Sequence, residues 1–325
     1  MKTQLTRRDW MIHSATAGLG LSASAGLCRA QASKAVLHKA MIIGKPDEAN
    51  LKPLKDAGFG GVECNAIVSM EEAVACRQIA DKMGMRIHSV LRGWAEFNSD
   101  DPKKVESSLL ATENALKAAK GYGSDAVLLV PCRIGGKGSN LAMPEAWEFE
   151  IEFDEKTGHL KRVAAGDNTK YKDYIEAHNR SLDTSVAAVK KLIPLAEKLK
   201  VVIALENVWN NLWVKPALFK HFVASFQNPW VKAYFDIGNH VKYAPPEQWI
   251  QALGSLLVKV HIKDFKLNPD GHGGQFVHPR DGSVNWPIVR QALDKVGYQG
   301  WLTIEDGGLP LEEFSKRLDL IIAGE

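Results

Sequence analysis

Four ionisable side chains lie at the C-terminal ends of apolar, strand-length runs in the second half of the chain: Glu206, Asp236, His261 and Glu305. Any one of them alone would most simply be salt-bridged or cap a helix. Together they predict one shared site, because charges gathered without partners repel each other and lose hydration at high cost. A divalent cation offsets that cost. Carboxylates with one imidazole form a mostly oxygen donor set that suits Mn²⁺, Mg²⁺, Co²⁺ or Zn²⁺.

The elements that must position these residues alternate between strand and helix. Strands are expected at 36–43, 61–67, 86–92, 126–132, 201–208, 231–237, 257–265 and 301–305. Helices are expected at 70–83, 102–120, 175–200, 216–226, 286–296 and 311–322, with Gly84, Gly121 and Gly297 as helix-ending glycines. Continuous apolar strands separated by helices indicate a parallel sheet covered by helices, so the chain predicts a closed (β/α)8 TIM barrel of the α/β class.

Two other organisations remain open at this point. A chain of 325 residues could form two domains. An open doubly wound sheet is the other alternative, but no Gly-rich dinucleotide loop follows the first expected strand. The run 135–138 (GGKG) lacks the ending of a phosphate loop and is interpreted as a flexible loop. In a barrel the active site lies at the C-terminal ends of the strands, where the four ionisable residues are expected.

A polar insertion at about 134–174 separates the fourth expected strand from its helix. Residues 148–153 (EFEIEF) alternate as in a hairpin strand and are followed by Lys156-Thr157-Gly158. Loops after barrel strands build the active-site face, so the insertion is expected to form a flap or rim over the site, or a surface hairpin without a role there.

The first 32 residues are typical of an export signal. Arg7-Arg8 precedes a weakly hydrophobic stretch, 11–27, and Ala30-Gln31-Ala32 forms an A-x-A cleavage site, as in a twin-arginine signal peptide. The stretch is too short and too rich in Gly and Ser for a stable membrane span. A lipoprotein signal at Cys28 is disfavoured by Leu27 before it, and a chance Arg-Arg pair is the remaining alternative. We therefore expect a signal at 1–32, one barrel domain at 33–325 and a periplasmic or otherwise exported protein.

Composition excludes several classes of protein. Hydrophobic residues make up 45% and charged residues 24%, which excludes disordered, collagenous and coiled-coil chains. With 41 Lys and Arg against 38 Asp and Glu, the net charge of +3 gives no electrostatic reason to expect nucleic-acid binding. The four cysteines form no CxxC pair, so neither a disulfide framework nor a zinc ribbon is supported.

The segments around the four candidate ligands resemble the xylose isomerase-like barrel superfamily. These segments are 204–207 (ALEN), 235–240 (FDIGNH), 260–264 (VHIKD) and 302–305 (LTIE). Residues 281–286 (DGSVNW) resemble the Gly-Glu-Gly-x-Val-Asp-Trp segment that precedes the seventh helix of that superfamily, with its first glycine and its acid altered. The resemblance extends over 35–324. It implies one divalent metal ion held by the two glutamates, the aspartate and the histidine, in agreement with the argument from the strands.

The resemblance further implies a sugar isomerase or epimerase that acts on a ketose or keto-sugar through an enediolate. Glu206 and Glu305 would be the catalytic pair, one removing a proton and the other returning it. One departure bears on the substrate. Many epimerases and nucleases of the superfamily have a histidine where this chain has Asn239, whereas the pentulose-phosphate 3-epimerase branch has an asparagine there as well. The metal site is unaffected by this change, and the substrate stays open.

Other polar and aromatic residues near strand ends are candidates for substrate binding. The principal ones are Glu63, His88, Asn239, Lys263 and Trp209. Lys263 would face the same way as His261, two residues before it, unless it is simply paired with a carboxylate. His88 could instead be a hydrogen-bonded core histidine. Further candidates are Asn65, Trp94, Trp213, His272 and His278, with the three tryptophans (Trp94, Trp209 and Trp213) each able to stack on a sugar or merely to pack.

Three other functions compete with this one. A metal-dependent keto-sugar lyase or dehydratase would use the same enediolate. An endonuclease IV-like phosphodiesterase would need a histidine-rich cluster of metals, which Glu63 and His88 do not supply. A sugar-binding barrel without catalysis is the third. The partner is expected to be a small, unphosphorylated sugar, because Asp306 places an anion beside Gly307-Gly308, where barrels commonly bind phosphate. Formation of a homo-oligomer is compatible with the sequence.

Overall fold

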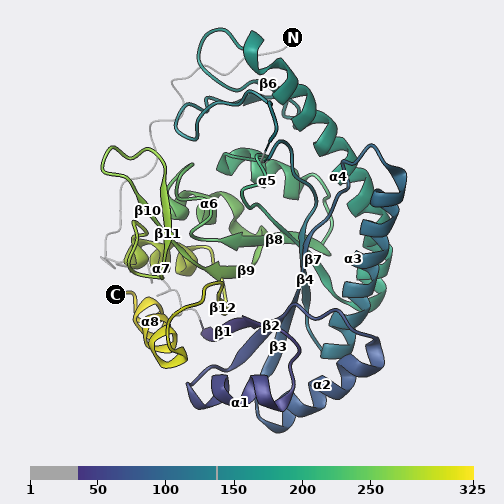
Figure 1. Ribbon diagram of the computed structural model, residues 1–325, viewed down its shortest axis with the longest axis vertical. Helices are drawn as coiled ribbons and strands as arrows, with labels where there is room; N and C mark the ends of the chain where they lie inside the picture. The colour runs from purple at the N-terminus through teal and green to yellow at the C-terminus, as the bar shows by residue number, and fades with distance from the viewer. Residues whose placement is uncertain (1–35, 137) are drawn as a thin grey trace, which may run out of the picture. The chain divides into compact units, whose positions relative to one another are not determined.

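Eight parallel strands pair edge to edge into a closed barrel in the computed structural model, which describes residues 36–136 and 138–325 (Figure 1). The strands are β1 (Leu37–Ile43), β2 (Gly61–Cys64), β3 (Arg86–Trp94), β4 (Ala126–Val130), β7 (Val202–Glu206), β8 (Val231–Asp236), β9 (Leu257–Ile262) and β12 (Gly300–Ile304). β12 closes the barrel by pairing with β1. The predicted (β/α)8 barrel is confirmed, and the expected signal at 1–32 lies outside the described residues.

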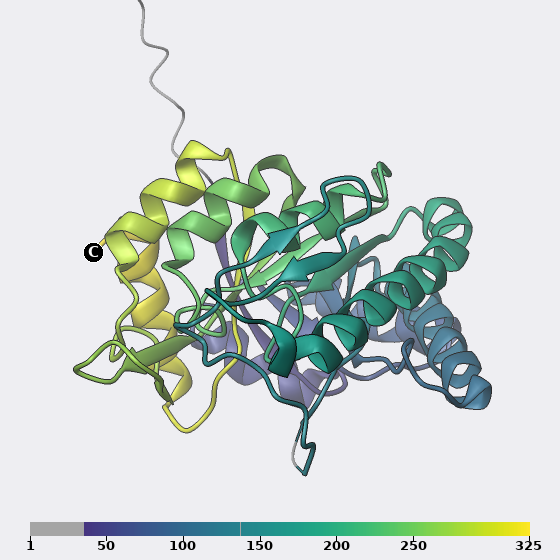
Figure 2. The ribbon, with the colours of Figure 1, turned by 90° about the horizontal axis from the view of Figure 1, so that it is seen from above.

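One helix follows each barrel strand before the next begins. The helices are α1 (Glu48–Asp56), α2 (Met70–Lys82), α3 (Pro102–Tyr122), α4 (Lys172–Leu199), α5 (Pro216–Ala224), α6 (Pro246–Leu253), α7 (Trp286–Lys295) and α8 (Leu311–Ala323), with 3-10 turns η1 (Thr169–Tyr171) and η2 (Gly254–Leu256). α3 and α4 lie side by side on the outside of the barrel (Figures 1 and 2). No helix in the described part of the chain combines the length and hydropathy needed to cross a bilayer.

Local sequence explains where α3 begins and ends. The Asp101 side chain accepts from the backbone N–H of Lys103, and Pro102 occupies the first turn, where no N–H is needed. The helix ends at Gly123, whose φ of 72° is the left-handed conformation that glycine adopts readily. The prediction that Gly121 ends this helix is wrong. Gly121 lies inside it, where a Cβ would come within 2.6 Å of the Met70 carbonyl oxygen, so glycine there permits the close approach of α2.

Most barrel strands are predominantly apolar because residues on both of their faces are buried, as all five residues of β4 are. In β4, Ala126, Leu128 and Val130 join Ala204 and Tyr234 in a small inner cluster, whereas Val127 and Leu129 belong to the large core that includes the surrounding helices. This alternation fills the barrel interior with side chains, and the cavity described below opens toward the C-terminal ends of the strands.

Two hairpins leave the barrel at that end. β5 (Glu152–Phe153) and β6 (Leu160–Arg162) pair within the insertion, so the expected hairpin is present but its first strand is shorter than 148–153. The preceding part of that segment is anchored otherwise, because Phe149 is buried against Tyr174 and Tyr243. β10 (Asp264–Leu267) and β11 (Gly274–Val277) form the second hairpin, which follows β9 and was not predicted.

Candidate active site

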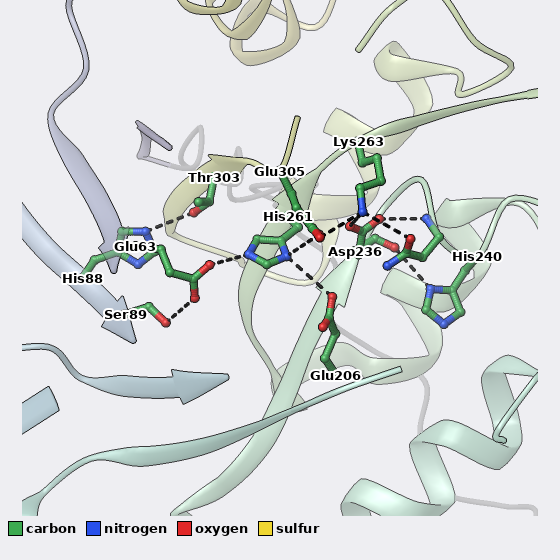
Figure 3. A network of polar contacts seen from close by, with 11 residues as sticks. Glu63, His88, Ser89, Glu206, Asp236, His240, His261, Lys263, Thr303 and Glu305 are labelled. Carbon is green, nitrogen blue, oxygen red and sulfur yellow. Dashed lines mark hydrogen bonds and ion pairs between the residues drawn. The ribbon is translucent and has the colours of Figure 1, made fainter. Parts of the chain in front are cut away.

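The barrel brings the four candidate metal ligands together at one end (Figure 3). Glu206 ends β7, Asp236 ends β8, His261 lies in β9 and Glu305 follows β12 directly. One ligand atom from each side chain lies within 4.8 Å of the other three. Glu206, Asp236 and His261 are buried, whereas the Glu305 side chain is 33% exposed. Side chains from adjacent strands thus converge where the sequence predicted a shared site.

The atoms that face one another in this cluster lack hydrogen bonds. They are His261 Nδ1, Glu206 Oε1, Asp236 Oδ2 and Glu305 Oε2, all buried and without a hydrogen-bond partner among the described residues. Nδ1 lies 3.0 Å from the Glu305 oxygen and 3.5 Å from the Glu206 oxygen. Leaving a buried polar atom unpaired is costly, and a bound divalent cation would give all of them a partner. The donor set and its geometry therefore fit a metal ion.

Burial also makes the cluster unfavourable as a set of bare charges. Burial raises the pKa of Asp236 to about 8, with the negative charges of Glu305 and Glu206 adding to the effect of burial. Burial likewise raises the pKa of Glu206. The pKa of His261 is lowered by burial but raised more by Glu63 and the neighbouring carboxylates, so it ends well above its usual value. Additional positive charge would relieve this repulsion.

A buried carboxylate behind His261 sets the orientation of its ring. Glu63 Oε2 lies 2.5 Å from His261 Nε2, and Ser89 Oγ donates to Glu63 Oε1 at 2.7 Å. With Nε2–H donating to Glu63, a cation bound in the cluster would replace the proton on Nδ1 and take its lone pair, which is the arrangement usual for metal-bound histidine. Glu63 was predicted to bind substrate, and the structure instead places it on the far side of His261 from the cavity-facing nitrogen.

Lys263 and Asn239 lie at the edge of the cluster and line the cavity above it. Lys263 Nζ is 3.0 Å from Glu305 Oε1 and 3.5 Å from Asp236 Oδ2. Burial lowers the pKa of Lys263, but these carboxylates raise it further, so the ammonium is charged. The Asn239 backbone N–H donates to Asp236 Oδ1 at 2.7 Å. Lys263 thus faces the same way as His261, as predicted, and is paired with carboxylates as well.

His88 is not brought into the cavity. Its Nε2 lies 3.0 Å from Thr303 Oγ1, and its ring stacks on Trp301 with centroids 5.0 Å apart. Burial lowers its pKa well below the usual value, so the imidazole is neutral. The position matches the alternative interpretation, a hydrogen-bonded core histidine.

The cavity above the cluster has a volume of about 230 Å³. Its remaining walls are apolar or aromatic: Leu91, Gly93, Trp94, Leu128, Val130, Val208, Trp209 and Phe276. The Trp209 Nε1–H donates to the Asn239 carbonyl oxygen at 2.6 Å, which fixes the indole against the cavity. A pocket with charged groups at its base and aromatic walls suits a ligand with both hydroxyls and C–H faces.

The remaining candidates are distributed around this site. Trp213 is fully buried and stacks on Phe222, so it packs within the core. His278 lines a neighbouring cavity, and His272 stacks on Trp147 of the insertion with centroids 4.3 Å apart. The insertion thus touches the β10–β11 hairpin, and none of its described residues (134–136 and 138–174) is among those that line the cavity. Sequence patterns gave no indication of Phe276, because β11 follows a glycine-rich loop.

The fold agrees with comparisons to known proteins. The family described as xylose isomerase-like TIM barrel matches residues 51–320, and the chain belongs to this family. It is 27% identical over 161 residues to the L-ribulose-5-phosphate 3-epimerase UlaE of Escherichia coli O1:K1, covering 48% of this chain and 52% of that protein. The chain spans about half the length of the curated relatives it matches.

Solved structures show the same fold at low identity. A xylose isomerase domain protein from Planctomyces limnophilus aligns with a TM-score of 0.64 and 16% identity over 90% of this chain and 97% of that one. The 3-keto-D-glucoside 4-epimerase YcjR from E. coli aligns with a TM-score of 0.61 and 12% identity over 88% and 99%. These likenesses establish the barrel architecture over nearly the whole of each structure.

Proposed function

We propose that this protein is a divalent-metal-dependent sugar isomerase or epimerase that acts on a ketose or keto-sugar through an enediolate. The observation that carries the proposal is the cluster of Glu206, Asp236, His261 and Glu305, each with a buried atom that has no hydrogen bond among the described residues. The epimerase activities of UlaE and YcjR, named for those proteins, support the same class of reaction.

The four side chains would hold the metal ion, with Asp236 and His261 serving mainly as ligands. A divalent cation bound there would polarise the carbonyl oxygen of a ketose and would acidify the C–H bond of the adjacent carbon, which carries a hydroxyl. Glu206 and Glu305 come from barrel strands separated by β8 and β9, so they approach the cavity from different directions. One would remove the proton as a base, and the other, in its protonated form, would donate a proton to the opposite face or to the neighbouring carbon.

Two further groups of this chain would assist. The Lys263 ammonium, 3.0 Å from Glu305 Oε1, would stabilise a developing oxygen charge or supply a proton. The apolar wall opposite it, including Leu128, Val130 and Val208, would keep bulk water away from a reactive intermediate.

Metal analysis combined with deuterium exchange tests this proposal. Purified protein should contain about one divalent ion per chain, and in deuterated water it should incorporate deuterium at carbon into one of a panel of ketoses and keto-glycosides. Removal of the metal by a chelator should abolish exchange, and readdition should restore it. Absence of both metal and exchange would contradict the proposal. A product lighter by a leaving group would assign a lyase instead.

The Glu206→Gln variant tests the assignment of the proton-transfer residues. The amide keeps the shape of the side chain but cannot accept the proton, so turnover should be abolished while the barrel remains folded by circular dichroism. Metal content is measured alongside, because Glu206 is also a ligand. Exposed Glu106 on α3 provides a matched control as Glu106→Gln. Retention of more than about a tenth of the activity would remove Glu206 from the role of base.

A further inference from the structure

A second cavity adjoins the one above the four candidate metal ligands. It has a volume of about 440 Å³ and shares Lys263, Phe276 and Glu305 with the inner cavity of about 230 Å³. Its other walls come from the β10–β11 hairpin and the segments after β11 and β12, including Gln275, His278 and Asp306. We call the two spaces the inner and the outer cavity.

The volumes indicate a ligand that occupies both. Pockets for small molecules have volumes of about 300–1,000 Å³. The inner cavity alone falls below this range, whereas the two cavities together lie well inside it. A ligand with its reactive part beside the four candidate metal ligands would therefore extend past Phe276 into the outer cavity.

Phe276 lies where the two cavities meet, and its ring is held in place. Its centroid is 4.7 Å from that of Trp209 and 5.2 Å from that of Phe265, yet 43% of the residue is exposed. A large aromatic side chain that is immobilised by its neighbours but left open offers a flat apolar surface without further loss of entropy. The C–H face of a sugar ring fits such a surface.

The polar groups of the outer cavity suit a neutral, hydroxyl-rich unit. The ammonium groups of Lys263 and Lys266 are balanced by carboxylates, and Lys263 is already paired with Glu305. His278 Nδ1 lies 2.8 Å from Asp306 Oδ2, so donor and acceptor atoms are fixed side by side. Hydroxyls can both donate to and accept from such a pair, whereas an anion would meet the carboxylate.

We propose that the outer cavity is a subsite for a second, neutral sugar-like unit. The substrate would then be a keto-sugar with a glycosidically linked group, such as a disaccharide, and not a free monosaccharide. This inference rests on the proposed function, because the keto-sugar that reacts is placed beside the four candidate metal ligands. Binding energy from the remote unit would raise kcat/KM by holding the reactive carbon in place.

Matched pairs of sugars test the subsite. Fructose is compared with isomaltulose, turanose, leucrose and maltulose, and a methyl keto-glycoside with the disaccharide carrying the same keto-sugar. Binding to the metal-loaded protein is measured by calorimetry, and kcat/KM is measured from deuterium incorporation. At least one disaccharide should bind about tenfold more tightly, or react about tenfold more efficiently, than its monosaccharide partner. Equal or better performance of the monosaccharide in every pair would overturn the proposal.

Variants of the outer cavity separate this inference from the proposed function. Phe276→Leu, which keeps apolar bulk but removes the flat face, and His278→Ala should each reduce the disaccharide preference by about tenfold. Leu110→Ala, at an exposed apolar residue on α3, serves as the control and should keep the preference. Phe276-dependent disaccharide binding without deuterium exchange would support the subsite and contradict the enediolate chemistry. Deuterium exchange without any preference for a disaccharide would support the enediolate chemistry and contradict the subsite.

Discussion

Glu63 and His261 lie 198 residues apart in the chain, yet Glu63 Oε2 lies 2.5 Å from His261 Nε2 and so connects the four candidate ligands to β2. Glu63→Gln would remove the charge that holds His261 Nε2–H, so affinity for Mn²⁺ should fall about 10- to 100-fold by calorimetry. Ser89→Ala leaves that charge in place and should have a smaller effect. An unchanged dissociation constant in Glu63→Gln would contradict the orienting role.

Residue types and strand ends were enough to predict the four candidate ligands, because each follows a buried apolar run. The positions of Glu63 and His88 could not be predicted in the same way. In the pairing of β2 with β3, Val62 lies opposite Ile87 and Glu63 opposite Ser89, so His88 is an extra residue at an irregularity of register. Such a bulge changes which face of the sheet a side chain points to, and simple alternation along a strand does not reveal it.

Among the elements, the barrel strands and most helices were predictable, whereas α1, α6 and the β10–β11 hairpin were not. α1 contains Pro53 in its interior, and α6 has only eight residues, so a helix is harder to predict at either place although each buries one apolar face. The β10–β11 hairpin follows β9 after a single residue, Lys263, and the expected strand at 257–265 ran the two together. That error concealed Phe276, which joins the inner and the outer cavity.

The segment after β11 is held by the buried carboxylate of Asp264. Its Oδ2 accepts from the backbone N–H groups of Arg280 and Gly282 at 2.9 and 3.2 Å, and its Oδ1 from that of Val284 at 3.3 Å. Segment 281–286 therefore shapes the rim of the outer cavity through its backbone contacts with Asp264. Glycine is required at position 282 because the backbone there lies close to the Asp264 carboxylate. A Cβ on residue 282 would lie 2.1 Å from Asp264 Oδ1.

We predict that Gly282→Ala lowers the free energy of unfolding by about 1–3 kcal/mol, because the added methyl group must displace Asp264 from its hydrogen bonds. Urea denaturation measures the change. Gly44→Ala is the matched control, since a Cβ at residue 44 meets nothing within 4 Å, and its effect should stay within about 0.5 kcal/mol. Equal stabilities for the two variants would show that the segment can move aside freely.

The stability of the whole molecule should depend on pH through buried His178 on α4. Neither of its ring nitrogens has a hydrogen-bond partner within 36–136 and 138–325, and burial lowers its pKa to about 3. Between about pH 6.5 and 3 the unfolded chain binds a proton that the native state excludes. The free energy of unfolding should therefore fall with decreasing pH in that window, by up to ~1.4 kcal/mol per unit from this residue.

Urea denaturation at pH 7.0, 6.0 and 5.0 measures this dependence. Below about pH 6.5, His178→Phe should reduce the slope of the free energy of unfolding against pH by up to ~1.4 kcal/mol per unit. This holds whatever the effect of the substitution on stability at pH 7. His240, whose pKa burial also lowers to about 3, is unchanged in the variant and should preserve part of the slope. A variant slope identical to that of the native sequence would show that His178 takes up its proton without unfolding.

The charges at the mouth of the barrel also bear on whether the substrate is phosphorylated. Barrels commonly bind phosphate after their last two strands, at backbone N–H groups near a helix N-terminus. Here the Gly307 N–H donates to Asp306 Oδ1 at 2.7 Å, and Asp306 lines the outer cavity. A phosphate group would therefore meet a carboxylate in place of free backbone donors, which favours an uncharged sugar.

The expected export signal points the same way, because phosphorylated metabolites are kept in the cytoplasm. The Arg7-Arg8 pair and the Ala30-Gln31-Ala32 site predict a processed protein outside it. We therefore expect a free sugar to have a higher kcat/KM than its phosphate ester. A preference of about tenfold or more for the ester would contradict this prediction. So would finding only uncleaved protein in the cytoplasm, whereas replacing Arg7 and Arg8 by lysine should confine it there and Lys2→Arg should not.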